Sequence, residues 1–276
     1  MAYHNKKILL ASKHQKEQAI APAFAEHLAC ELAVANLDTD QFGTFTGETE
    51  RLLSPYETCV LKAKTAMNQE NYYLAIASEG SFGPHPALPF VNCGHEIMVF
   101  VDLHHDWIIA EQLLTVNTNY HTLTIKQHDN IDSFLHKVKF PSHALTLQTS
   151  DKKVLAKGIT DYKTLMSLIK QGFCQDDSLL LAADMRAMMN PTRMNSLGEL
   201  ANKLVKRIKV HCPSCQAPGF GFKTTQDYLP CSLCHQKTSL YRFEVWGCIQ
   251  CPYEEAKSRQ DKLIFADPTH CDYCNP

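Results

Sequence analysis

Residues 74–90, LAIASEGSFGPHPALPF, decide how the first part of this chain is interpreted. Residues 74–77 form a short apolar run of the kind that makes a buried strand. Ser, Glu, Gly and Ser follow at once, and these residue types usually interrupt strands. The pattern predicts a strand that ends at residue 77 and leads into a loop rich in glycine and proline, with the Glu79 carboxylate at the strand end.

A loop of this kind is where binding groups usually lie on a rigid scaffold. Glu79 is the candidate catalytic carboxylate of this segment, and Ser81 and His85 are candidate substrate-binding residues. The alternative is a structural turn in which the Glu79 carboxylate is only solvated. The rest of the chain has to decide between these two interpretations.

Length and composition bound the class of protein. The 276 residues suffice for one sizeable core and a small appendage, which predicts one or two domains. The formal net charge is −2, so no overall basic charge points to nucleic acid. Residues 1–7 lack the apolar core of a signal peptide, and no run approaches the roughly 18 apolar residues of a membrane span. We expect a cytoplasmic protein with no membrane partner.

A polar turn between a strand and a helix is predicted near the N-terminus. Residues 7–11, KILLA, are apolar, and apolar residues recur at helical spacing over residues 19–28. The turn between them, SKHQKE, brings the N–H groups of a helix start and Lys13 or Lys16 beside a strand end. This arrangement suits a phosphate group. The alternative is an ordinary solvated turn.

Residues 37–51 are dense in acids, hydroxyls and glycine and lack a long apolar period, so they are expected to form a loop. A loop of that length inside a compact domain is often functional. Asp38 and Asp40 offer carboxylate oxygens, the ligands that hard metal ions prefer. The alternative is that these acids are exposed and only solvated.

A helix is predicted to begin after Ser54, where Ser, Pro and Glu follow the pattern of a capping box. Glu57, at the third helical position, therefore has a sufficient structural role. Lys62 lies five residues further on, so Glu57 and Lys62 together are also candidates for a site.

The remaining elements complete a layered domain. Further strands are predicted at residues 96–102, 107–110, 122–125, 144–147 and 178–183. Helices are predicted from Asn130, from Asp161 to Gly172, and from Asn190 onward. This mixture predicts an α/β domain over residues 1–209, with a mixed sheet flanked by helices.

Charged residues gather where the last of these strands meets the last helix. Asp184, Arg186 and Arg193 lie around this turn. One carboxylate and two guanidinium groups can hold an anionic substrate. The alternative is an ion pair that ties the helix to the sheet.

The composition changes near residue 210, where four Cys-x-x-Cys pairs begin. Eight of the twelve cysteines belong to these pairs, which favours metal thiolates in a reducing compartment over disulfides. The eight are Cys212, Cys215, Cys231, Cys234, Cys248, Cys251, Cys271 and Cys274.

Two such pairs complete a tetrahedral shell around one zinc ion, with zinc–sulfur bonds of about 2.3 Å. The sequence therefore predicts two closed, structural zinc sites in a small zinc-ribbon-like domain over residues 210–276. The spacing leaves the pairing open. Consecutive pairs can share an ion, or the arrangement can be interleaved, with Cys212 and Cys215 joined to Cys248 and Cys251.

These segments carry two resemblances. From ASKH at residues 11–14 through ASEGSFGPHP at residues 77–86 to the closing CDYCNP, the chain looks like an uncharacterised bacterial family of unknown function. Residues 7–102 also resemble the start of the inosine and xanthosine triphosphate pyrophosphatases. In those enzymes a strand leads into a Ser/Thr-x-Asn-x-x-Lys turn, a helix carries Glu and Lys-Ala, and a strand ends in an acidic-Gly loop that binds magnesium.

The second resemblance implies roles for individual residues. Ser12 and Lys16 match the phosphate turn, Glu57 and Lys62 match the helix, and Glu79 matches the magnesium loop. The chain departs from the pattern in three places. It has histidine where the turn usually has asparagine, it lacks the Ser and His that precede the arginine of the family, and it lacks the Phe/Gly-Tyr-Asp-Pro segment that recognises the base.

We therefore expect a hydrolase of nucleotides or related phosphate esters, most concretely a nucleoside triphosphate pyrophosphatase that uses Mg²⁺ or Mn²⁺. The expected catalytic residues are Glu79, Glu57 and Asp40, and Asp38 is a further candidate Mg²⁺ ligand. The expected substrate-binding residues are Ser12, Lys16, Lys62, Ser81, His85, Asp184, Arg186 and Arg193.

The alternative hypothesis is a zinc-ribbon protein that binds nucleic acid or another protein and has no catalytic activity. Basic residues gather near residue 206, and aromatic residues of the tail offer surfaces on which bases stack. The aromatic residues in question are Phe220, Phe222, Tyr228 and Tyr241. Acidic residues of the same segment dilute its positive charge.

Overall fold

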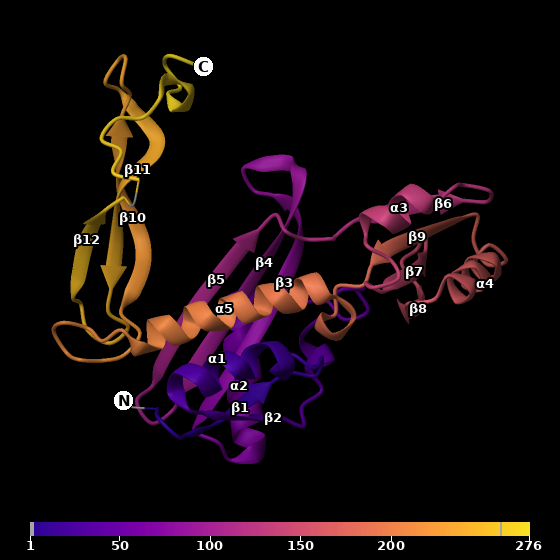
Figure 1. Ribbon diagram of the computed structural model, residues 1–276, viewed down its shortest axis with the longest axis horizontal. Coiled ribbons are helices and arrows are strands. Elements are labelled where there is room, and N and C mark those ends of the chain that lie inside the picture. The colour runs from indigo at the N-terminus through magenta and orange to yellow at the C-terminus, as the bar shows by residue number, and fades with distance from the viewer. Residues whose placement is uncertain (1–2, 260) are drawn as a thin grey trace. The chain divides into compact units, whose positions relative to one another are not determined.

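In the computed structural model, which describes residues 3–259 and 261–276, the chain begins with a five-stranded sheet of order β2-β1-β3-β4-β5 (Figure 1). Its strands are β1 (Lys7–Ala11), β2 (Glu31–Val34), β3 (Leu74–His85), β4 (Leu88–Asp102) and β5 (Trp107–Thr115). The strand β1 pairs in parallel with β2 and β3, and the pairs of β3 with β4 and of β4 with β5 are antiparallel. The expected mixed sheet is confirmed.

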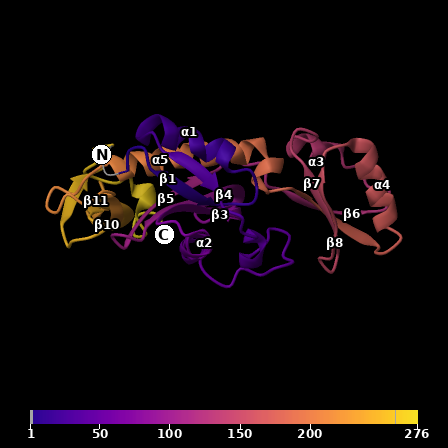
Figure 2. The same cartoon turned by 90° about the horizontal axis from the view of Figure 1, so that it is seen from below.

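Two helices cover opposite faces of this sheet, α1 (Glu17–Leu28) and α2 (Pro55–Glu70) (Figure 2). The predicted capping box of α2 is present, because Ser54 Oγ accepts from Glu57 N at 3.3 Å and Glu57 Oε2 accepts from Ser54 N at 3.0 Å. Alternate residues of β3 and β4 pack on the buried face of α2, as a period of two requires. A 3₁₀ helix, η1 (Thr39–Phe42), is the one regular element described in the predicted loop over residues 37–51.

A second, four-stranded antiparallel sheet has the order β6-β9-β7-β8. Its strands are β6 (Thr122–Lys126), β7 (Leu145–Thr149), β8 (Val154–Ile159) and β9 (Ser178–Ala183). Buried residues of α3 (Asp132–Lys137) and α4 (Tyr162–Gly172) form one apolar core with these strands. The long helix α5 (Pro191–Lys209) follows, and the side chain of Asn190 caps it by accepting from Arg193 N at 3.0 Å.

The prediction that the strand from Leu74 ends at residue 77 is wrong. The strand β3 continues through Glu79 to His85 and pairs with β4, which begins at residue 88 rather than 96. The ladder between β1 and β3 ends at Ala77, so over the following residues β4 alone among the described strands pairs with β3. Glycine and proline are tolerated at such a sheet edge. Glu79 therefore lies within a strand, where its orientation is fixed.

Smaller differences concern short elements. The strands β2 and β8 were not predicted, because each has few residues and only partial burial of its side chains. The helix predicted from Asn130 has Ile131 at its N-cap, while the Asn130 side chain accepts from Asp132 N at 2.8 Å. The cap of α4 by Asp161 is as predicted.

The chain divides into two compact units, Met1–Val205 and Lys206–Pro276. The second unit contains a three-stranded antiparallel sheet with β10 (Gly221–Pro230), β11 (Lys237–Gly247) and β12 (Glu254–Ser258) in that order. In total the described residues form three sheets and five α-helices, an α/β architecture as expected. None of the described helices is long and apolar enough to cross a membrane.

Gly80 provides a test of this packing. A Cβ atom at Gly80 would lie 2.7 Å from both Arg193 Nη2 and Glu96 Oε2, two side chains that are held in place by burial. We expect Gly80→Ala to lower the free energy of unfolding by about 1–3 kcal/mol. Chemical denaturation measures this change.

The matched control is Gly83→Ala on the same strand, where a Cβ atom would meet nothing within 4 Å. We expect this substitution to leave the free energy of unfolding unchanged or to raise it by up to about 1 kcal/mol. Equal destabilisation by the two substitutions would contradict the packing described for β3.

Candidate functional site

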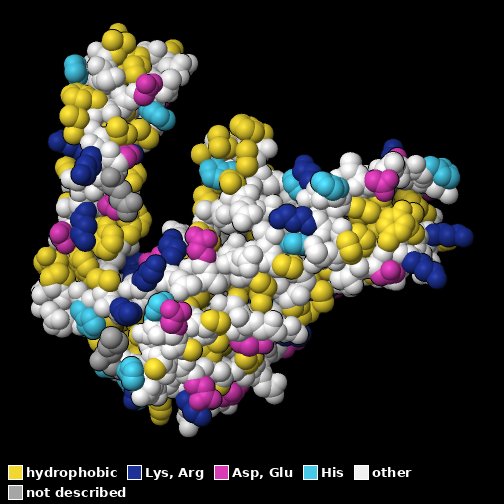
Figure 3. Space-filling view, in the orientation of Figure 1, with side chains coloured by type: hydrophobic (Ala, Val, Ile, Leu, Met, Phe, Trp, Pro, Cys, Tyr) yellow, Lys and Arg dark blue, Asp and Glu magenta, His cyan; other side chains and the backbone are white. Residues whose placement is uncertain are grey.

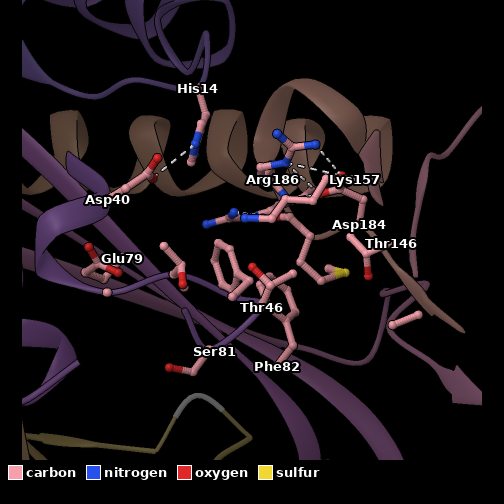
Figure 4. A pocket seen from close by; sticks show the side chains of 18 of the residues that line it. His14, Asp40, Thr46, Glu79, Ser81, Phe82, Thr146, Lys157, Asp184 and Arg186 are labelled. Atoms are coloured by element: carbon pink, nitrogen blue, oxygen red, sulfur yellow. Dashed lines mark hydrogen bonds and ion pairs between the residues drawn. The ribbon is translucent and has the colours of Figure 1, made fainter. Parts of the chain in front are cut away.

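A cleft of about 750 Å³ lies in the unit Met1–Val205 (Figure 4). Eight cationic side chains line it among the described residues: Lys13, Lys16, Arg51, Lys62, Lys152, Lys157, Arg186 and Arg193. Three carboxylates line it: Asp40, Glu79 and Asp184. The excess of positive charge suits an anionic ligand, because a concave site concentrates the field of its charges.

The turn between β1 and α1 presents donors to this cleft. Ser12 is buried, and its Oγ is the only buried side-chain oxygen or nitrogen of the described residues that has no hydrogen-bond partner. Lys16 occupies the N-cap position of α1, where its side chain makes no capping hydrogen bond. The backbone carbonyls of Gln15 and Lys16 accept from Gln18 N and Ala19 N at that helix start. A buried hydroxyl without a partner in a turn before a helix is a favourable place for a phosphate oxygen, because the helix dipole adds positive potential there.

Lys16 carries a buried amino group with neutral partners. Its Nζ donates to the carbonyl oxygen of Ser78 at 3.1 Å and to Ser78 Oγ at 3.0 Å. Burial, followed by the charge of Arg193, lowers the pKa of Lys16 to about 8. A bound anion would stabilise the ammonium form and raise this pKa again.

His14 and Asp40 lie on the same side of the cleft (Figure 4). Lys13 Nζ donates to Asp38 Oδ1 and to Asp40 Oδ2, both at 2.8 Å. His14 Nε2 is 3.6 Å from Asp40 Oδ1. Burial, and next the charge of Lys16, lowers the pKa of His14 to about 4, so this imidazole is neutral near pH 7.

Glu79 reaches the cleft from β3 and is held by two cations. Lys62, from α2, donates to Glu79 Oε1, and Arg51 Nη1 lies 3.6 Å from Glu79 Oε2. Arg51 Nη2 also donates to Ser81 Oγ at 2.8 Å. Lys62 and Arg51 therefore balance the negative charge of the Glu79 carboxylate, and a bound phosphate would attract the same two cations.

Arg193 lines the cleft, but its guanidinium group is already bound to protein partners. It donates to both oxygens of Glu96, at 2.6 and 3.2 Å, and to the carbonyl oxygen of Met185. The side chains of Arg193 and Glu96 are each only 1% exposed. Its guanidinium carbon also lies 4.6 Å from the ring centroid of Phe45 and 5.2 Å from that of Phe82.

The second sheet supplies the other wall. Arg186 donates to both oxygens of Asp184, and Gly158 N donates to Asp184 Oδ2 at 3.0 Å. Lys157, on β8, pairs with Glu48 of the loop that follows η1. This loop is thus attached to both sheets, which closes one side of the cleft.

The structure brings most of the predicted site residues together. Those that line the cleft are Ser12, Lys16, Asp40, Lys62, Glu79, Ser81, Asp184, Arg186 and Arg193. Three predicted site residues do not line the cleft: Glu57, His85 and Asp38. Glu57 lies in the capping box of α2 and His85 is the last residue of β3. Asp38 accepts a hydrogen bond from Lys13, which does line the cleft. The roles of all these residues in binding or catalysis stay predictions.

Sequence reasoning missed several cleft residues. Arg51 comes from an irregular loop and Lys157 from the unpredicted β8. Glu96 does not line the cleft but holds Arg193 behind it, and this role was missed as well. The signal that was available for Glu96 is a carboxylate directly before the apolar residues 97–101, since such a group requires a cationic partner when it is buried. Arg51 and Lys157 carry no comparable local signal.

The cysteines of the second unit form two separate sets of four. One set is Cys212, Cys215, Cys248 and Cys251, and the other is Cys231, Cys234, Cys271 and Cys274. The interleaved pairing is therefore the correct one of the two left open by the spacing. The β10–β11 hairpin explains it, because Gly221 lies opposite Gly247 at one end of the ladder and Pro230 lies opposite Lys237 at the other.

Each set has the dimensions of a zinc site. The sulfur atoms of a tetrahedral zinc–thiolate site are about 3.8 Å apart when each bond is about 2.3 Å. Two Sγ–Sγ distances in the first set are 3.7 and 3.5 Å, and two in the second set are 3.9 and 3.5 Å. Hydrogen bonds from backbone N–H groups, first that of Cys234, lower the pKa of Cys231 to about 7, whereas the hydrogen bond with the Cys234 side chain raises the pKa of Cys274 in the same set to about 12. Both sets could hold a zinc ion.

Several cations of the second unit are paired with acids of the same unit. Lys223 pairs with Glu254, and Arg259 Nη2 donates to Asp261 Oδ2 at 2.6 Å. These pairs leave less positive charge for a nucleic acid backbone than the sequence count of cations implies. Binding of nucleic acid or of a protein partner by this unit stays a prediction.

Comparison with known protein families identifies a match over most of the chain. A family model described as a domain of unknown function matches residues 62–276, from the middle of α2 to the end of the chain. The matched part contains Glu79 and both cysteine sets, and it leaves out the turn between β1 and α1. No curated protein matches the chain.

The interleaved pairing can be tested by zinc stoichiometry. In the double variant Cys212→Ser with Cys248→Ser both changes fall in one set, so the protein should lose about one of two zinc ions. In Cys212→Ser with Cys231→Ser each set loses a ligand, so almost no zinc should remain. Elemental analysis of reduced protein purified without added metal gives both values.

The two double variants serve as each other's control, because each removes two thiolates. Sequential pairing would give the reverse result, with about one zinc ion kept by the second variant and almost none by the first. A stoichiometry near zero zinc ions per chain in reduced wild-type protein would refute both zinc sites.

Proposed function

The chain belongs to the DUF6671 family, a domain of unknown function, and since membership assigns no activity, we propose from the cleft that the protein hydrolyses nucleotides or related phosphate esters. The observation that carries the proposal is the unpartnered Ser12 hydroxyl in the turn before α1, in a cleft rich in cations. The most concrete form of the proposal is a nucleoside triphosphate pyrophosphatase, the activity that the resemblance of residues 7–102 implies.

Phosphate binding is the first step of this proposal. Ser12 Oγ donates to a phosphate oxygen, and Lys16 Nζ turns from its neutral partner Ser78 to the same group. Arg186 adds positive charge from the opposite wall. Hydrolysis of phosphate esters relies mainly on such positioning and charge stabilisation, so these groups supply much of what the reaction needs.

Exchange of ion pairs is the second step. A bound phosphate competes with Glu79 for Lys62 and Arg51, and this competition frees the Glu79 carboxylate. Asp40 can be freed from Lys13 in the same way. The two carboxylates then orient a water molecule, whose oxygen bonds to phosphorus as the bond to the leaving phosphate oxygen breaks and its proton passes to a carboxylate.

A divalent ion fits this proposal only together with the substrate. Among the described residues, three or more His, Cys, Asp or Glu ligand atoms converge within 4.8 Å only at the two cysteine sets. The carboxylates of Glu79, Asp40 and Asp38 each form ion pairs with lysine or arginine instead. We propose that Glu79, once released from its ion pairs, would hold Mg²⁺ or Mn²⁺ together with the substrate phosphates, and that the ion would supply charge stabilisation there.

The two cysteine sets have a different part in the proposal. With four thiolates around each zinc ion, no position is left for water, so the ions would stabilise the second unit rather than act on substrate. Its exposed apolar residues include Leu233, Ile264 and Tyr273, which leaves few large aliphatic groups for a core. Such a small segment commonly depends on metal for folding.

Nucleotide hydrolysis gives the direct test. Purified protein is assayed with standard and deaminated nucleoside triphosphates and Mg²⁺ or Mn²⁺, with release of phosphate or pyrophosphate as the readout. Glu79→Gln should lower kcat by at least about 100-fold, because the amide cannot replace the charged carboxylate. Asp40→Asn should also lower kcat.

The matched control is Asp161→Asn. This carboxylate caps α4 outside the cleft, and asparagine is an equally good N-cap, so activity should stay within about twofold of wild type. Thermal unfolding establishes that each variant is folded. Absence of turnover with every nucleotide, or full activity in folded Glu79→Gln and Asp40→Asn, would refute the proposed function.

A further inference from the structure

An aromatic side chain stands exposed in the cationic cleft. Phe45 lines the cleft and is 43% exposed. Phe82 and Tyr120 line the cleft as well, with their ring centroids 6.2 Å apart. The exposed part of this phenyl ring leaves apolar surface in water, which a ligand ring would cover favourably.

The ring of Phe45 packs against Arg193 and Phe82. The guanidinium carbon of Arg193 lies 4.6 Å from its centroid, and Arg193 is itself fixed by Glu96. The ring of Phe82 lies 5.7 Å away, tilted by 56°. Phe45 is therefore supported before any ligand arrives, which lowers the entropy cost of stacking on it.

Three polar groups next to Phe45 in the sequence each make a hydrogen bond within the protein. Thr44 Oγ1 accepts from Thr49 N at 3.1 Å, and Thr46 Oγ1 donates to Glu48 Oε2 at 2.8 Å. The carbonyl oxygen of Thr46 accepts from Gln148 Nε2 at 2.8 Å. The surroundings of Phe45 thus offer a ring face to a ligand but leave few groups to read the edge of a base.

We propose that Phe45 is the stacking platform for the base of a nucleotide, and that the cleft binds nucleoside polyphosphates with little preference among bases. The inference rests on the proposed function, since it assumes that the phosphates occupy the Ser12–Lys16 turn. It deepens that function by naming both the binding residue and the breadth of the substrate class.

The breadth follows from the physics of stacking. Every base has a π face, whereas discrimination between bases requires hydrogen bonds to particular edge atoms. Selectivity for deaminated bases is therefore not expected here.

Calorimetry with nucleotides and with inorganic triphosphate separates the base from the phosphates. Wild-type protein should bind ATP, GTP, ITP and UTP with dissociation constants within about tenfold of one another. Each should bind about 5- to 100-fold more tightly than inorganic triphosphate, the range expected for one stacked base. Phe45→Ala should remove this difference and leave the affinity for inorganic triphosphate unchanged, and Phe45→Trp should retain the difference.

The matched control is Phe90→Ala. Exposed hydrophobic side chains gather at the end of the β3–β4 hairpin (Figure 3), and Phe90 in that region is 85% exposed and does not line the cleft. Its removal should leave the affinity for all these ligands unchanged. Thermal unfolding of Phe45→Ala establishes that the variant is folded.

The outcomes distinguish the inference from the proposed function. If inorganic triphosphate binds but nucleotides bind no more tightly, or if Phe45→Ala keeps the full difference, the stacking inference is wrong and the phosphate site stands. Strong preference for one base overturns the proposed breadth. If neither inorganic triphosphate nor any nucleotide binds, the proposed function and the inference both fail.

Discussion

The buried ion pair between Arg193 and Glu96 is the interaction on which the site depends. It joins the first turn of α5 to β4, and through the Met185 carbonyl it also joins the segment that follows β9. Breaking a buried pair of this kind by removing one partner typically costs about 3–5 kcal/mol, because the other charge is left uncompensated. The pair also explains the glycine at position 80 of β3, because a Cβ atom there would collide with both side chains. The rings of Phe45 and Phe82 pack near the Arg193 guanidinium group.

Local signals in the sequence predict much of the fold. The caps at Ser54, Asp161 and Asn190 are found where the sequence indicates, because a cap needs only residues within one helical turn. The path of β3 beyond Ala77 was not predictable in the same way. Its glycines and proline fit because β1 ends beside Ala77, and that is a property of the assembled sheet rather than of the segment.

The same distinction applies to the site. Lys16 belongs to a strand, turn and helix that lie next to one another in sequence, so its place in the cleft could be predicted. Arg51 and Lys157 reach the cleft from segments more than 100 residues apart. The cysteine spacing predicts the ligands but not which pairs share an ion, because both pairings satisfy it and only the β10–β11 ladder decides between them. Glu57 shows the limit of pattern matching, since one sequence pattern fits both a capping box and a catalytic helix.

The central claim is that the Ser12–Lys16 turn binds the phosphates of the substrate. A crystal structure of the protein with a non-hydrolysable nucleoside triphosphate and Mg²⁺ tests it most directly. The account predicts phosphate oxygens at about 3 Å from Ser12 Oγ and Lys16 Nζ, with Glu79 separated from Lys62. Phosphates bound elsewhere, with the Ser12 hydroxyl still without a partner and the pair of Glu79 and Lys62 intact, would contradict it.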